Sequence, residues 1–188
     1  FFAALSRKIE KRASTAIPTA GVRVCPDTAQ FEMIYNPDFF DSLPEEQVKG
    51  VLKHEFYHLI FEHVTSRRPE GVNHKVWNIC ADLAINSHLV GELPDNCCMP
   101  GVGPFEGLPK GESAEWYLAN FPERPEGEGE GEGEGEPGEG SGEGSGEGES
   151  FDDHSGWSED GDSPAQEAAN QMAKERLKQG MKEAAKEA

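Results

Sequence analysis

The most informative segment is KHEFYHLIFEH, residues 53–63, which holds three histidines and two glutamates. His54 and His58 are four residues apart, so on a helix their rings lie on one face, one turn apart, where both can bind one cation. Glu55 lies beside that face. This is the H-E-x-x-H arrangement: two zinc ligands, and a general base for a zinc-bound water that hydrolyses a peptide bond. The alternative is two surface histidines on a buried helix. It is disfavoured because the helix pattern is strong and its apolar stripe lies on the other side, clear of both histidines: Val48, Leu52, Phe56 and Leu59.

Glu62 and His63, which lie shortly after the motif, are not expected to bind the metal. His63 comes five residues after His58, a rotation of about 140° on a helix, which turns it toward the apolar side. Enzymes that recruit a third histidine shortly after this motif break the helix with a glycine, and Phe61 stands at that position here. We therefore expect His63 to pack or to hydrogen-bond near the helix end. Glu62 is expected to be a surface carboxylate or to contact the ligands without binding the metal.

A catalytic zinc ion needs a third protein ligand and an open position. The segment WNICADLAIN, residues 77–86, carries Asn78, Asp82 and Asn86 every four residues on an otherwise apolar helix. Such a polar row is costly to bury unless it has something to bond, so Asp82 is the predicted third ligand. Asn86 is expected to hydrogen-bond one motif histidine through the ring nitrogen that faces away from zinc. The alternative is a row that faces water, and the reserve candidates, as ligands or as groups that stabilise the oxyanion, are His88 and His154.

The segments around the two helices predict an α+β fold. Residues 1–14 have the pattern of an amphipathic helix, and the extended runs 22–25 and 31–35 flank turn residues, as in a β-hairpin. Ser42 and Glu45 have capping-box spacing at the start of the motif helix, which is expected to end at the basic residues before Pro69. Three further helices have predicted N-caps: Asn73, Ser113 and Ser163.

The net charge of −19 is concentrated in one segment. Ten glutamates lie between Glu126 and Glu149, interleaved mainly with glycine. Such a run self-repels and buries too little apolar surface to offset its ordering entropy. We therefore expect a folded domain over residues 1–122, a disordered acidic linker over 123–150, and a last part over 151–188 with the segment FDDHSGW and a C-terminal helix.

Composition also disfavours several classes of protein. The chain has no stripe of basic residues, so nucleic-acid binding is not expected, and no apolar run approaches the ~20 residues that cross a membrane. The cysteines show no CxxC spacing and are expected to be reduced, as in a cytoplasmic protein; adjacency alone is a weak signal for metal binding by the last two: Cys25, Cys80, Cys97 and Cys98. Because the chain does not open with methionine, we expect a piece of a longer protein.

Three segments together carry a family resemblance: FFAALSRKIEKR (1–12), IYNPDFFDSLPEEQVKGVLKHEFYHLIFEH (34–63) and WNICADLAIN (77–86). They resemble the metallopeptidase domain that is found ahead of a von Willebrand factor A-like domain, over roughly residues 1–120. The segment FDDHSGW is similar to one in longer members. The resemblance implies a zincin-like fold, Zn²⁺, and the motif residues His54, Glu55 and His58 as its site. It also implies an AAA-type ATPase and a C-terminal von Willebrand factor A-like domain as partners.

In zincin-like folds, an edge strand above the metal pairs with an extended peptide substrate. The strand that carries Phe31, Met33 and Tyr35 is the candidate here. The alternative, an ordinary interior hairpin, is equally compatible with the pattern.

Two functions follow from these observations. The first is a zinc metalloendopeptidase that acts on a protein or peptide substrate, with Glu55 as general base. The second is a non-catalytic, metal-stabilised interaction module that works with an AAA-type ATPase or an assembly. The glutamate of the motif favours the first, because a purely structural site needs no carboxylate there.

Overall fold

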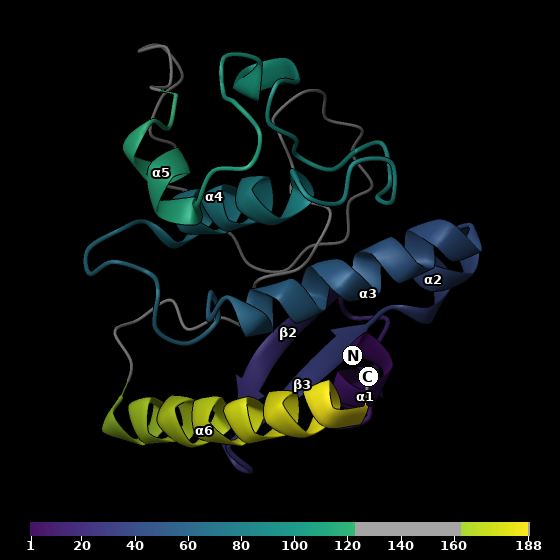
Figure 1. Ribbon diagram of the computed structural model, residues 1–188, viewed down its shortest axis with the longest axis vertical. Coiled ribbons are helices and arrows are strands. Elements are labelled where there is room, and N and C mark those ends of the chain that lie inside the picture. The colour runs from purple at the N-terminus through teal and green to yellow at the C-terminus, as the bar shows by residue number, and fades with distance from the viewer. Residues whose placement is uncertain (123–162, 188) are drawn as a thin grey trace.

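A three-stranded sheet lies beneath the helix that carries the motif (Figure 1). The computed structural model describes residues 1–122 and 163–187. The strands are β1 (Glu10–Ala13), β2 (Ala20–Cys25) and β3 (Gln30–Tyr35), in the order β1-β3-β2. β2 and β3 are antiparallel, and β1 runs parallel to β3. The predicted α+β class and the predicted hairpin are confirmed.

The predicted helix over residues 1–14 is wrong beyond its first half. The helix α1 spans only Phe2–Ser6, and the chain then extends into β1, whose four residues are all exposed. Leu5 and Ile9 are both buried, as a helix would also place them, so their spacing was ambiguous. The edge strand was missed because its charged residues show no alternation, and pairing with β3 overrides their weak strand propensity.

The predicted substrate strand needs a correction. β3 lies in the middle of the sheet, with β2 on one side and β1 on the other from Glu32 to Tyr35. Phe31 and Met33 are buried in the hydrophobic core. The backbone of β3 therefore bonds its neighbouring strands, and two of its predicted contact residues face the interior, so the interior alternative holds.

Two helices lead into the site. Helix α2 (Pro37–Ser42) is capped by Asn36, whose Oδ1 accepts from the Asp38 amide at 3.0 Å. Helix α3 (Glu45–Ile60) has Pro44 as its N-cap residue. The predicted capping box is wrong, because the Ser42 hydroxyl donates to the Phe39 carbonyl at 2.6 Å and so serves the end of α2. α3 also ends at Ile60, well before the basic residues Arg67 and Arg68 at which it was expected to end.

The remaining helices begin at the predicted caps. The Asn73 side chain accepts from two amides at the start of α4 (His74–Asn86), and Ser113 caps α5 (Ala114–Ala119). A short 3-10 helix, Gly103–Phe105, precedes α5. Helix α6 (Pro164–Glu187) begins with the Ser163 hydroxyl accepting from the Gln166 amide at 3.2 Å. No helix within these described ranges is both long and apolar enough to span a membrane.

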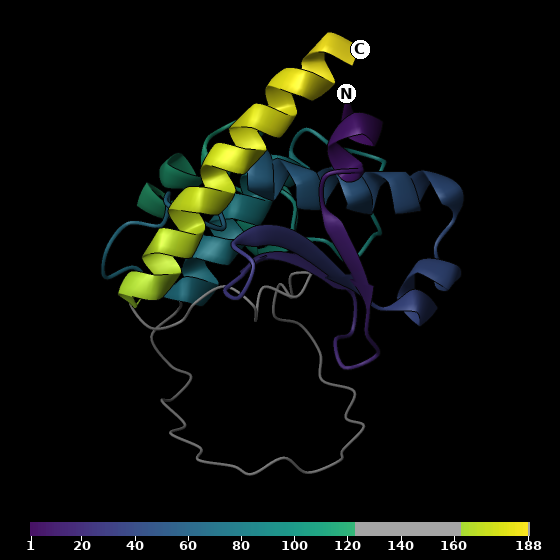
Figure 2. The same ribbon diagram turned by 90° about the horizontal axis from the view of Figure 1, so that it is seen from below.

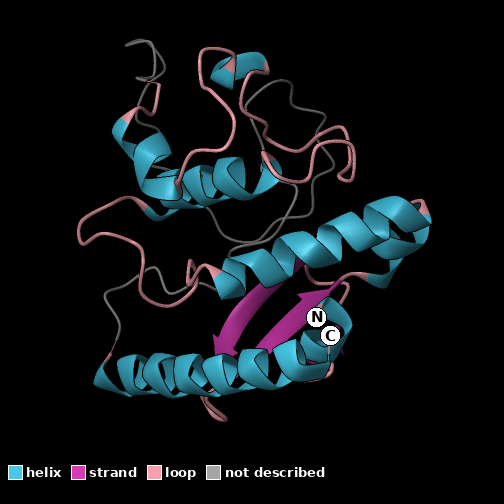
Figure 3. Ribbon diagram, viewed as in Figure 1, coloured by secondary structure: helices cyan, strands magenta, loops and turns pink. Residues whose placement is uncertain are grey.

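The helices form two groups on opposite sides of α3 (Figure 3). One hydrophobic cluster joins α1, α6, one side of α3 and the apolar face of the sheet. Figure 2 shows α6 lying along this part of the molecule, with its C-terminal end near α1. A second cluster joins α4 and α5 around Trp77 and Tyr117. α3 therefore lies between two hydrophobic clusters, and its motif histidines face α4.

The loop after α4 is held tightly against α3. Gly50 is required there, because a Cβ atom at this position would lie 1.9 Å from the Glu92 carbonyl oxygen. Lys53 forms an ion pair with the Glu92 side chain. These contacts fix the C-terminal half of α4, which carries the predicted ligand Asp82, against the motif helix.

Candidate metal centre

Three side-chain atoms converge between α3 and α4. The Nε2 atoms of His54 and His58 lie 2.9 Å apart. Asp82 Oδ1 lies 3.2 Å from His58 Nε2 and 3.7 Å from His54 Nε2. All three residues are 0 % exposed. The structure thus brings together the two motif histidines and Asp82 as one group that could hold a metal ion.

The spacing of these atoms fits a tetrahedral zinc ion. Ligand atoms at about 2.0–2.1 Å from zinc lie about 3.3 Å from one another in a tetrahedral arrangement. The three separations, 2.9, 3.2 and 3.7 Å, scatter around that value. The donor set also fits, because two imidazoles and one carboxylate are common zinc ligands and leave a fourth position for other groups. A cation among them would balance the buried Asp82 carboxylate, which is costly to bury as an uncompensated charge.

His54 is oriented by Asn86, the residue one turn beyond Asp82 on α4. The Asn86 Nδ2 group donates to the Cys98 carbonyl at 2.8 Å, which leaves its Oδ1 to face the imidazole. That oxygen lies 2.7 Å from His54 Nδ1. An amide oxygen can only accept, so His54 Nδ1 carries the proton and Nε2 presents its lone pair to the metal position.

Cys98 also contacts the predicted third ligand. Its Sγ donates to Asp82 Oδ2 at 3.9 Å and is 3.8 Å from Asn86 Nδ2. The second oxygen of the carboxylate is therefore engaged by the loop after α4, while Oδ1 faces the histidines. The sequence indicated no such role for Cys98, and its only signal was the neighbouring cysteine.

His63 contacts the other motif histidine. Its Nδ1 lies 3.3 Å from His58 Nδ1, and the side chain is 3 % exposed. The predicted hydrogen bonding near the helix end is what the structure shows, but the predicted direction was wrong. Because α3 ends at Ile60, the rotation of an unbroken helix does not apply, and His63 returns beneath His58 instead of facing the apolar side.

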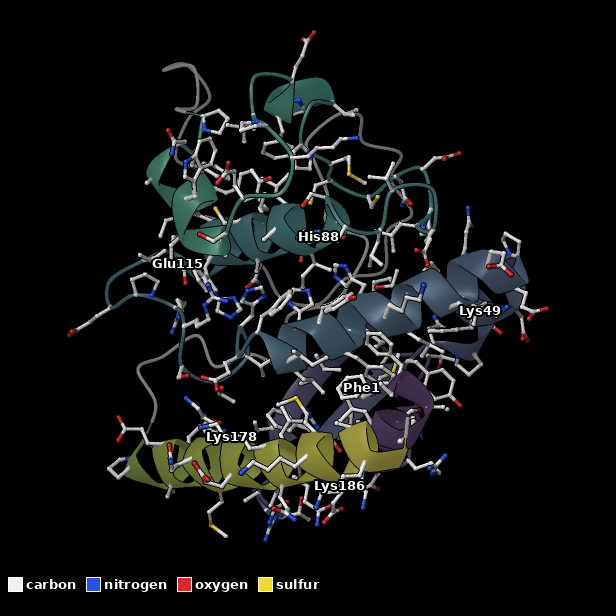
Figure 4. All side chains as sticks on the ribbon, viewed as in Figure 1. Phe1, Lys49, His88, Glu115, Lys178 and Lys186 are labelled. Atoms are coloured by element: carbon white, nitrogen blue, oxygen red, sulfur yellow. The ribbon has the colours of Figure 1, made fainter. Side chains whose placement is uncertain are left out.

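The other candidates lie in different places. Glu55 is buried next to His54 on α3. Glu62 is partly exposed, and its carboxylate pairs with Lys174 of α6 at 2.5 Å. His88 is exposed just after α4 and is not among the converging residues (Figure 4). His154 and FDDHSGW lie outside the described residues, as does the expected linker.

Two neighbouring cysteines are protonated at neutral pH. Burial raises the pKa of the Cys80 thiol to about 12, and the charge of Asp82 adds to the shift. Burial likewise raises the pKa of the Cys97 thiol to about 11, with Asp82 again contributing. Both groups are therefore neutral thiols in the metal-free protein.

Comparison with known proteins identifies the family. A family model described as "Putative metallopeptidase domain" matches residues 1–188. The chain belongs to this family. This finding confirms the resemblance to a metallopeptidase domain that the sequence motifs indicated, and the family's chemistry agrees with a buried cluster of two histidines and an aspartate on facing helices.

One relative adds a distant similarity. The chain is 27% identical over 62 residues to an uncharacterized protein of Thermotoga maritima. The aligned part covers 33% of this metallopeptidase-domain chain and 16% of that protein, so the chain spans a small fraction of its relative's length. No solved structure matches the chain.

Proposed function

We propose that this chain is a zinc-dependent metalloendopeptidase in which His54, His58 and Asp82 hold the metal. The observation that carries the proposal is the convergence of the two Nε2 atoms and one carboxylate oxygen within 2.9–3.7 Å of one another. Family membership supports it independently.

In this proposal, different residues bind the metal and transfer the proton. Zinc, when bound, acts as a Lewis acid and lowers the pKa of a coordinated water toward about 7. Glu55 accepts a proton from the attacking water as the new C–O bond forms, and returns it to the amide nitrogen as the C–N bond breaks. Asn86 keeps the proton of His54 on Nδ1, so that Nε2 stays available to the metal.

A second candidate is a metal-stabilised interaction module without catalysis. The observation that favours it is the complete burial of Glu55 together with the three candidate ligands, because a peptide substrate has to reach a catalytic site. An AAA-type ATPase or a von Willebrand factor A-like domain is the partner expected for this candidate, on the strength of the family resemblance.

The variant Glu55→Gln separates the two candidates. It removes the proton acceptor and keeps the size of the side chain, so we expect one zinc per chain in both proteins. We also expect cleavage of a panel of unfolded proteins to fall by about 10²–10⁴-fold in the variant. Metal content by elemental analysis and peptide products by mass spectrometry are the measurements.

The outcomes distinguish the two functions. Zinc in both proteins and cleavage by neither would favour the interaction module. A wild-type protein that carries no transition metal after purification without chelators would overturn both.

A further inference from the structure

We propose that His63 is a positioning residue that holds the ring of His58 in its metal-binding orientation. The inference rests on the proposed function, because it assigns a role toward the same metal position. It is carried by three observations: the turn that brings His63 back to α3, the enclosure of its ring, and the proton that must lie between the two imidazoles.

The turn after α3 reverses the chain within two residues. The His63 amide donates to the His58 carbonyl at 3.0 Å, and the Glu62 amide donates to the Leu59 carbonyl at 3.1 Å. This pair of bonds is the Schellman arrangement, which requires a left-handed residue between the helix end and the returning chain. Glu62 supplies it with φ +60°, a conformation that glycine adopts far more readily. The break that the sequence appeared to lack at Phe61 is therefore provided one residue later.

Glu62 is held in this unusual conformation by contacts from outside the turn. Lys174 of α6 pairs with its carboxylate at 2.5 Å, and the Ser66 hydroxyl donates to it at 3.1 Å. Burial alone would raise the pKa of Glu62, but these hydrogen bonds and the charges of Lys174 and Lys178 together outweigh it and lower that pKa. Arg67 also donates to the Phe61 carbonyl at 3.2 Å. The turn is thus fixed from both sides, which fixes the direction in which His63 leaves it.

The ring of His63 is enclosed between the two site helices. Trp77 of α4 packs edge-on against it, with ring centroids 5.9 Å apart and an interplanar angle of 86°. The Trp77 indole also donates to the His63 carbonyl at 3.4 Å. With only 3 % of the residue exposed, the imidazole has little room to rotate away from His58.

Metal binding by His58 determines which nitrogen carries the proton between the rings of His58 and His63. For His58 Nε2 to bind zinc, its Nδ1 must carry the proton. His63 Nδ1, 3.3 Å away, must accept it and carry its own proton on Nε2. His63 therefore does for His58 what the Asn86 oxygen does for His54 at 2.7 Å. Partners of this kind orient metal-binding histidines, and their loss typically lowers metal affinity 10–100-fold.

Two substitutions separate the hydrogen bond from the packing. His63→Asn places Oδ1 where Nδ1 stood and keeps an acceptor, whereas His63→Phe keeps the ring against Trp77 and removes the acceptor. We expect zinc affinity of the full chain, measured by competition with a chelator, to fall about 10–100-fold in His63→Phe. In His63→Asn we expect it to stay within about threefold of wild type. Equal affinity in wild type and His63→Phe, or an equal loss in both variants, would overturn the inference and leave the proposed function intact.

A measurement on the wild-type protein tests the role of His63 even if a variant fails to fold. Imidazole nitrogen NMR of the zinc-loaded chain is expected to show His58 protonated on Nδ1 and His63 protonated on Nε2. A proton on His63 Nδ1 would overturn the inference. A wild-type chain that binds no zinc at all would instead overturn the proposed function, and this inference with it.

Discussion

Two sides of α3 contain buried residues, but the chemistry of these residues differs between the sides. Toward the sheet, α3 places apolar side chains such as Leu59 in a cluster with α1 and α6. Toward α4, it places His54 and His58, which meet Asp82 and Asn86. Burial of the first kind stabilises the fold by roughly 25 cal/mol per Å² of apolar surface. Burial of the second kind costs free energy unless each polar group is bonded and the charge is balanced.

This difference separates the contacts that stabilise the fold from the contacts that depend on a bound metal. The apolar side stabilises the domain whether or not a cation is present. The polar side becomes favourable only through its hydrogen-bond partners and a positive charge. Substitutions on the two sides should therefore differ in how zinc changes their effect.

The largest effect on stability is expected from Leu59→Ala, on the apolar side. Removing a fully buried leucine side chain costs about 2–5 kcal/mol, from lost burial and the cavity left behind. Urea denaturation should show this loss equally in metal-free and zinc-loaded protein. A loss seen only with zinc would contradict the separation of the two sides.

Asp82→Ala should have the next largest effect, and on metal binding rather than on the metal-free fold. We expect zinc affinity to fall at least about 100-fold, or ~2.7 kcal/mol, beyond what loss of a ligand's partner typically costs. Stability of the metal-free protein should change little or rise, because a buried carboxylate is removed. Asp95→Ala, at an exposed site on the loop after α4, is the matched control with the same change in charge. Unchanged affinity in Asp82→Ala would mean that another group is the third ligand.

The smallest effect on stability is expected from the ion pair between Arg67, which follows α3, and Glu115 of α5, whose side chains are 2.6 Å apart. Burial alone would raise the pKa of Glu115, but the hydrogen bonds from Arg67, the backbone and Ser113, together with the charge of Arg67, outweigh it and lower that pKa. A lowered folded-state pKa gives stability that is present above about pH 4.5 and lost as the pH falls through the folded value. Because both side chains are at least one-third exposed, the contribution is below about 1 kcal/mol.

Denaturation of metal-free protein across pH 3–6 tests this pH-dependent contribution of the Arg67–Glu115 pair. Wild type should lose slightly more stability on acidification than Glu115→Gln. Identical pH profiles would show that the pair contributes nothing to the docking of α5.

Much of the site followed from local spacing, and the failures have physical causes. The i, i+4 histidines and the Asp82 row needed only helical geometry, which is local. The strand β1 was missed because its charged residues show no alternation and its partner lies about twenty residues away. The direction of His63 was missed because a left-handed glutamate is rare, and this one is held by Lys174, more than one hundred residues later.

Residue patterns alone predicted the motif helix, the facing polar helix and the hairpin, because periodicity and capping act within a few residues. The metallopeptidase family was indicated by the resemblance of longer segments and shown by the family comparison. The packing of the elements was needed to show that β3 is central, that Cys98 contacts Asp82, and that His63 turns back to His58. Each of these depends on contacts between residues that are distant in the chain or on a backbone conformation that distant contacts stabilise. Such contacts leave no periodic signal in the sequence, and so they become visible only when the elements are packed together.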